Sequence, residues 1–139
     1  MSITNLVDML KLHEGLMLKP YQCTAGKTTI GYGRNLDDMG ISEHEAEALL
    51  HNDIKRVRRE LAALDIGNGL DDVRTAVVVD MCFNLGINRL LGFRNFISAL
   101  RVKDFERAAR EMVDSNWYRQ VGTRAKRLVK MMETGEWPE

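Results

Sequence analysis

The sequence has few of the residues that build disulfide-rich or metal-dependent proteins. It contains only two cysteines, Cys23 and Cys82, which lie far apart and form no CxxC pair. Such a pair supplies neither a disulfide framework nor a structural zinc site. The three histidines complete no metal-ligand spacing. We therefore expect no metal and no cofactor, and a fold held together by its apolar core.

Other features are missing as well. Proline occurs only twice, and no apolar run approaches the roughly 20 residues that cross a bilayer. Lys and Arg together equal Asp and Glu together at 20 each, so net charge gives no reason to expect a nucleic-acid partner. The N-terminal residues mix polar and apolar side chains and lack the cationic start of a secretory signal. We expect a monomer without stable membrane insertion, made in a cytoplasm.

What is present fits one folded domain. The chain of 139 residues is 45% hydrophobic and 29% charged, which suffices for a real core. One stretch carries basic residues and no acid: Arg119, Arg124, Lys126, Arg127 and Lys130. A solvated helix face and a surface that attracts an anionic polymer both fit this stretch.

The N-terminal part predicts a small lobe. Apolar residues at helical spacing predict a helix that begins near Ile3 and ends just before Glu14. Over residues 16–36, glycines interrupt β-branched and aromatic residues, which is typical of a small antiparallel sheet. We place its turns at Pro20 and at residues 24–26.

The remainder of the chain predicts helices. Ser42 and Glu45 form a capping box that opens a long helix. Asp71 is expected to cap a second helix, apolar on nearly all sides and therefore central, which stops near Gly86. Further helices are predicted at about 93–100, 104–114 and 124–133. Trp117, Tyr118 and Trp137 are interpreted as core anchors.

Together these elements predict a single α+β domain. A sheet lobe covers about residues 14–41 and a connecting helix about 42–64. A helical lobe covers about 65–139 and also includes the N-terminal helix.

Glu14 is the first candidate for chemistry, because it lies between an apolar helix and a glycine-rich sheet. A surface carboxylate at a helix end is the commoner state of such a residue. A general acid at the junction of two lobes is the alternative, and nothing local decides between them.

A wider pattern surrounds Glu14. Eight residues separate it from Cys23, and five more separate Cys23 from Thr29. This spacing resembles the catalytic signature of the T-even phage lysozyme family, glycoside hydrolase family 24, which has Glu, then Asp or Cys, then Thr. Later segments resemble family segments in the same order: Asn84–Gly86, Gly92–Phe93, Trp117–Tyr118, Arg124–Arg127 and Thr134–Trp137. The resemblance covers nearly the whole chain.

The resemblance implies a lysozyme-like fold and an endolysin. Such an enzyme hydrolyses the β-1,4 bond between N-acetylmuramic acid and N-acetylglucosamine in the glycan strands of bacterial peptidoglycan. Glu14 would be the general acid, and Thr29 would hold the attacking water. Cys23 stands where many members carry Asp. Three roles stay open for it: a thiolate base, a covalent nucleophile, or a polar group that places water.

The resemblance also implies residues around the sugar. Tyr32 and Leu36 would bind substrate from the sheet lobe, and Phe83 and Asn84 from the helical lobe. Simple core packing is an equal interpretation of Phe83. Arg124 would contact and orient Glu14. An endolysin of this kind waits in the host cytoplasm and reaches the periplasmic wall after a holin permeabilises the membrane.

Three other functions compete with hydrolysis. A lytic transglycosylase cuts the same bond with one Glu and no water-activating partner, so it has less need of Cys23 and Thr29. A catalytically inactive peptidoglycan-binding module has no need of Glu14. A Cys–His acyl hydrolase would require an orienting residue that cannot be placed beside His13 or His51.

Overall fold

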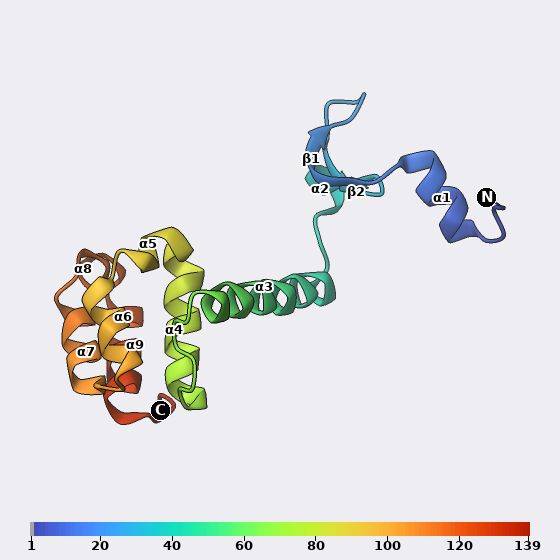
Figure 1. The fold of residues 1–139 in the computed structure, drawn as a ribbon. Helices are drawn as coiled ribbons and strands as arrows, with labels where there is room; N and C mark the ends of the chain where they lie inside the picture. The colour runs from blue at the N-terminus through green and yellow to red at the C-terminus, as the bar shows by residue number, and fades with distance from the viewer. Residues whose placement is uncertain (1) are drawn as a thin grey trace. The chain divides into compact units, whose positions relative to one another are not determined.

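The computed structural model describes residues 2–139. By its internal contacts the chain divides into two compact units, Met1–Leu49 and Leu50–Glu139. The structure is mainly helical with one small antiparallel sheet (Figure 1). The predicted α+β class is confirmed. The boundary between the units falls inside the long helix α3 (Glu43–Ala63). The assignment of the N-terminal helix to the helical lobe stays a prediction.

The first unit contains a three-stranded sheet between short helices. Helix α1 (Leu6–Glu14) precedes strands β1 (Met17–Gln22), β2 (Thr28–Gly31) and β3 (Arg34–Asn35), and helix α2 (Leu36–Met39) follows. The strands are antiparallel in the order β1-β2-β3. Helix α2 contacts β2 through the Asp37 carboxylate, which accepts the Thr28 N–H at 2.8 Å.

Helix α1 begins later than the sequence predicts. Asn5 is its N-cap, and the Asn5 side chain accepts the Asp8 N–H at 2.8 Å. Because Asn satisfies the free N–H groups of a first turn, it starts the helix here rather than near Ile3. Glu14 is the last helical residue rather than the first one beyond, and Gly15 ends the helix with a φ of 71°.

The turn predicted at Pro20 is wrong, because Pro20 lies inside β1. Strand β1 is at the edge of the sheet, and its pairing with β2 is irregular between Met17 and Tyr21. A proline without an N–H is tolerated at such a break in an edge strand. The turn predicted at residues 24–26 is confirmed: the Gly26 N–H donates to the Cys23 carbonyl at 2.8 Å.

The capping box is confirmed at the start of α3. Ser42 Oγ accepts the Glu45 N–H at 3.1 Å, and Glu45 Oε1 accepts the Ser42 N–H at 3.0 Å. Glu45 also binds both terminal nitrogens of Arg34, at 2.8 and 2.7 Å. The Arg34 hydrogen bonds and the Ser42 N–H lower the pKa of Glu45 to about 2. One carboxylate thus joins the helix start to β3.

The second unit is a helical bundle around α4 (Asp72–Leu85). Asp71 caps α4 by accepting the Arg74 N–H at 3.2 Å, and Gly86 ends it, as predicted. The remaining helices are α5 (Ile87–Leu91), α6 (Arg94–Arg101), α7 (Phe105–Val113), α8 (Asn116–Val121) and α9 (Thr123–Thr134). Helix α4 is buried along most of its length, which confirms its central place.

Two helices of this unit were not predicted. Helices α5 and α8 have only five and six residues, too few for an apolar period to appear. Trp117 is buried and confirmed as a core anchor, and Tyr118 packs against the core. The prediction that Trp137 is a core anchor is wrong, since 61% of Trp137 is exposed. It follows Gly135, whose left-handed conformation ends α9.

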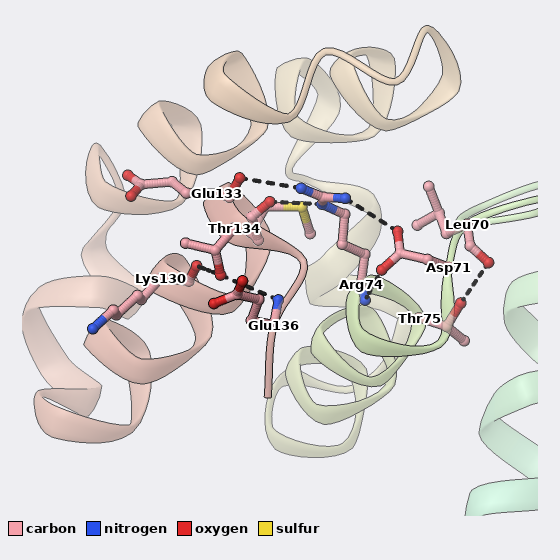
Figure 2. A network of polar contacts seen from close by, with 9 residues as sticks. Leu70, Asp71, Arg74, Thr75, Lys130, Glu133, Thr134 and Glu136 are labelled. Atoms are coloured by element: carbon pink, nitrogen blue, oxygen red, sulfur yellow. Dashed lines mark hydrogen bonds and ion pairs between the residues drawn. The ribbon is translucent and has the colours of Figure 1, made fainter. Parts of the chain in front are cut away.

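Arg74 ties three helices of the second unit together. Figure 2 shows its guanidinium between Asp71 and the end of α9. It donates to the carbonyls of Met132 at 2.7 Å and Glu133 at 3.1 Å, and lies 3.8 Å from the ring centre of Phe105. Its side chain is only 15% exposed. It therefore closes free carbonyls at a helix C-terminus and adds a cation–π contact.

We predict that Arg74→Met lowers the free energy of unfolding by about 2–4 kcal/mol, because charge-assisted hydrogen bonds at a partly buried site are lost. Arg56→Met is the matched control: Arg56 pairs with Asp53 at 2.9 Å but is 58% exposed, so the loss should stay below about 1 kcal/mol. Urea unfolding followed by circular dichroism measures both. Equal losses would contradict this account of Arg74.

Candidate active site

The β1–β2 hairpin brings Cys23 and Thr29 together. Tyr21 pairs with Thr29 and Gln22 with Thr28, so Cys23 opens the turn just beyond the paired residues. The Lys27 carbonyl accepts the Cys23 N–H at 2.9 Å and the Thr29 hydroxyl at 3.0 Å. Two of the three residues predicted for catalysis are thus joined through one main-chain oxygen.

The surroundings of the Cys23 sulfur favour the thiolate. The N–H groups of Lys27 and Ala25 and the Thr29 hydroxyl hydrogen-bond to it and lower the pKa of Cys23 below its ordinary value. Cys23 is half-buried, so it is reachable from solvent. A sulfur of this kind can accept a proton or attack an electrophile.

Thr29 is a polar residue placed almost wholly inside the unit. It is 4% exposed, and burial of a hydroxyl requires a hydrogen-bond partner. Its single hydroxyl hydrogen goes to the Lys27 carbonyl or to the Cys23 thiolate. In either case the oxygen lone pairs stay able to accept a hydrogen bond from water.

Glu14 lies at the C-terminal end of α1, where its side chain is exposed and faces the turn between β2 and β3. The same helix approaches this turn a second time through Lys11, whose ammonium lies 5.5 Å from the ring centre of Tyr32. The carboxylate is therefore held beside the sheet, in the same unit as Cys23 and Thr29.

Two residues predicted to bind sugar belong to this unit. The Tyr32 ring is 45% exposed on the β2–β3 turn. Leu36 is half-buried at the first position of α2, after the N-cap Asn35. Tyr32 directly follows β2, which carries Thr29, and Leu36 directly follows β3, so both lie in one short segment of the sheet unit.

The second unit contains the other predicted residues. Phe83 is 43% exposed, which contradicts its interpretation as a simple core residue. It lines a groove of about 400 Å³ with Leu50, Ile54, Arg58, Ala76, Val79, Asp80 and Arg124. Aromatic rings exposed in a mainly apolar groove are typical of ligand sites.

Asn84 is exposed, and its side-chain oxygen accepts the Trp117 indole N–H at 2.9 Å. The partner of this amide oxygen is therefore a buried tryptophan of its own unit. This contact fixes the amide plane, which leaves the nitrogen as the end that points to other acceptors.

Arg124 makes a close ion pair with Asp80, with nitrogen–oxygen distances of 2.7 and 2.9 Å. Its expected contact with Glu14 joins residues of different units and stays a prediction. Sequence reasoning missed Asp80, although an acid within an otherwise apolar helix is a usable signal. It also missed Lys27 and Gly33, whose roles depend on backbone geometry.

Within residues 2–139, no group of three or more His, Cys, Asp and Glu side chains is arranged to hold a metal ion. The candidate catalytic groups are the carboxyl group of Glu14, the Cys23 thiol of lowered pKa and the Thr29 hydroxyl. Groups of these types are able to transfer protons and to activate water.

The chain is similar to known lysozymes. The family model described as Phage lysozyme matches residues 11–133. The protein named "Probable T4-type lysozyme 1" from Dictyostelium discoideum is 28% identical over 163 residues, covering 96% of this chain and 96% of that protein. The protein named "Endolysin" from Acyrthosiphon pisum secondary endosymbiont phage 1 is 33% identical over 109 residues, covering 76% and 73%.

The contacts of the two cysteines predict different reactivity. At neutral pH, iodoacetamide should alkylate Cys23 at least ~10-fold faster than Cys82, because Cys82 is buried and burial raises its pKa. A lowered pKa keeps Cys23 ionised as the pH falls. Its rate–pH midpoint should therefore lie below that of the same cysteine in the urea-unfolded chain.

Peptide mass mapping after timed quenching measures both rates across a pH series. Coincident midpoints in the folded and unfolded chains would show that the turn does not favour the thiolate.

Proposed function

The chain belongs to the phage lysozyme family, and from this premise we propose that it cuts the β-1,4 bond between N-acetylmuramic acid and N-acetylglucosamine in peptidoglycan, with Glu14 as general acid. Membership makes the chain a lysozyme, a glycoside hydrolase of the muramidase class. The bond and the residue roles are the proposal.

The observation that carries the proposal is the pairing of Cys23 with Thr29 in the unit that holds Glu14. A hydrolase needs an acid for the leaving group and a group that activates water. A transglycosylase needs only the acid, because its own substrate supplies the nucleophile. A thiol of lowered pKa bonded to a threonine hydroxyl supports water attack.

In the proposed reaction Glu14 gives its proton to the glycosidic oxygen while the bond to C1 of N-acetylmuramic acid breaks. Positive charge then develops on C1 and the ring oxygen, as in an oxocarbenium ion. A water oxygen bonds to C1 and loses one proton to the Cys23 thiolate. Solvent then takes the proton from Cys23 and returns one to Glu14, which restores both groups.

Among the three roles left open for Cys23, the base is the one we propose. A covalent bond between its sulfur and C1 would be a thioglycoside. Sulfur in such a bond is protonated poorly, so the intermediate would break down slowly. Thr29, whose hydroxyl donates to the Lys27 carbonyl or to the Cys23 thiolate, would orient the water by accepting one of its hydrogens.

The remaining residues would bind the glycan strand. The exposed rings of Tyr32 and Phe83 fit the apolar faces of sugars, and Leu36 would extend the surface beside Tyr32. Asn84 would donate its amide N–H to an N-acetyl carbonyl, since its oxygen is held by Trp117. We also propose that Arg124 orients Glu14 in the enzyme–substrate complex.

One relative supports a proposal for the biological setting. It is named an endolysin, and we propose the same role here, with release to the periplasmic wall after the host membrane is permeabilised. Within residues 2–139, no helix has both the length and the apolar character needed to cross a bilayer.

The test is mass spectrometry of the soluble fragments released from purified peptidoglycan. The wild-type chain should release muropeptides with free reducing N-acetylmuramic acid ends. Glu14→Gln should lower the rate by about 10²–10⁴-fold, because the amide cannot donate the proton. Glu43→Gln, in the first turn of α3, is the matched control and should keep the wild-type rate.

Two outcomes would contradict the proposal. Anhydro-muramic ends would identify a transglycosylase. No release by a folded wild-type chain that still binds the wall would identify a binding module.

A further inference from the structure

Gly33 and Glu14 occupy adjoining space. An L-residue at position 33 would place its Cβ 2.5 Å from Glu14 Oε2, 3.0 Å from Cδ and 3.3 Å from Cγ. The first of these distances is well inside van der Waals contact. The Glu14 side chain therefore lies where a side chain on residue 33 would begin, and only a glycine leaves that space free.

The backbone at Gly33 has little room to move away. Gly33 follows β2 and directly precedes β3, whose Arg34 pairs with Ile30 in the sheet. The Arg34 side chain is held by both oxygens of Glu45 and by the Gly40 carbonyl at 3.1 Å. A new side chain at position 33 would therefore displace Glu14 rather than the turn.

Glu14 has more freedom than the turn. It is the last residue of α1, and Gly15 after it has a φ of 71°, which only glycine adopts readily. In the structure its carboxylate lies along the bare backbone of Gly33. The turn thus limits the positions that this carboxylate can take.

We infer that Gly33 is a positioning residue for Glu14, because the absence of its side chain lets the turn hold the carboxylate in its working place. The inference rests on the proposed role of Glu14 as general acid. A displacement of about 1 Å in a catalytic group can lower a rate by about 10²-fold. Substrate binding elsewhere on the chain would change little.

Gly31 provides a matched control. Its φ is +70° against +79° for Gly33, so an alanine suffers similar backbone strain at either position. A Cβ on Gly31, however, meets no atom within 4 Å. The two glycines are two residues apart, Gly31 at the end of β2 and Gly33 in the turn that follows. They therefore separate the effect of strain from the effect of contact with Glu14.

The experiment compares Gly33→Ala and Gly31→Ala with the wild-type chain, with soluble uncrosslinked peptidoglycan strands as substrate. Both variants should lower the thermal unfolding midpoint through backbone strain, and Gly33→Ala should lower it further because its Cβ also meets Glu14. Gly33→Ala should lose about 10²-fold in kcat with KM within about 3-fold, while Gly31→Ala should keep kcat within about 3-fold. Equal effects on kcat, in either direction, would overturn the inference.

Glu14→Gln in the same assay separates the two proposals. If it retains activity, the general-acid role fails, and the positioning role fails with it. If it is inactive while the two alanine variants behave alike, only the positioning role fails.

A second measurement does not depend on activity. In a Glu14→Ala chain, nothing beyond Cβ is left to meet residue 33. Gly33→Ala should then lower the unfolding midpoint less than it does in the wild-type chain. Gly31→Ala should lower it equally in both backgrounds. An equal effect of Gly33→Ala in both backgrounds would overturn the inference.

Discussion

The ion pair between Arg34 and Glu45 fixes the geometry on which the first unit depends. Each terminal nitrogen of the Arg34 guanidinium donates to one oxygen of the Glu45 carboxylate, and the same carboxylate closes the capping box with Ser42. The pair is exposed, with about two fifths of each side chain accessible, so it contributes geometry more than stability. Because its pKa is lowered to about 2, Glu45 is fully ionised above the usual glutamate range, and its pairing with Arg34 is complete there. The pairing is lost as the pH falls toward 2 and Glu45 becomes protonated. Gly33 directly precedes Arg34. The ion pair of Arg34 with Glu45 therefore helps to fix the position of the turn that faces Glu14.

Backbone geometry also governs the chemistry of the other catalytic candidates. A single carbonyl, that of Lys27, joins Cys23 to Thr29. The N–H groups of the same turn lower the pKa of the Cys23 thiol. Neither effect requires a charged neighbour, which is how, in the proposed mechanism, Cys23 would act at a position that often carries Asp in the family. A thiol ionises less readily than a carboxyl group. The main-chain N–H groups of this hairpin stabilise the Cys23 thiolate, as N–H groups of a tight turn stabilise any anion toward which they point.

Local signals in the sequence predicted the elements whose causes are local. The caps at Ser42 and Asp71 and the turn at residues 24–26 depend on residues three or four apart, and all three are confirmed. The turn at Pro20 was wrong because the sheet tolerates proline at an irregular edge, which only the pairing reveals. The close approach of Glu14 to Gly33 joins elements far apart in sequence. The candidate catalytic residues came from the family resemblance rather than from their own chemistry, since an isolated Glu, Cys or Thr is usually unremarkable.

We propose that Cys23, with Thr29, activates a water that attacks C1 on the face opposite the bond that Glu14 breaks. Such an attack inverts the anomeric centre. Proton NMR during the first minutes of cleavage of a soluble glycan strand resolves the new reducing end before mutarotation. If water attacks from that face, the α-anomer appears first. An initial β-anomer would contradict the proposal, because retention requires attack from the other face or a covalent glycosyl intermediate.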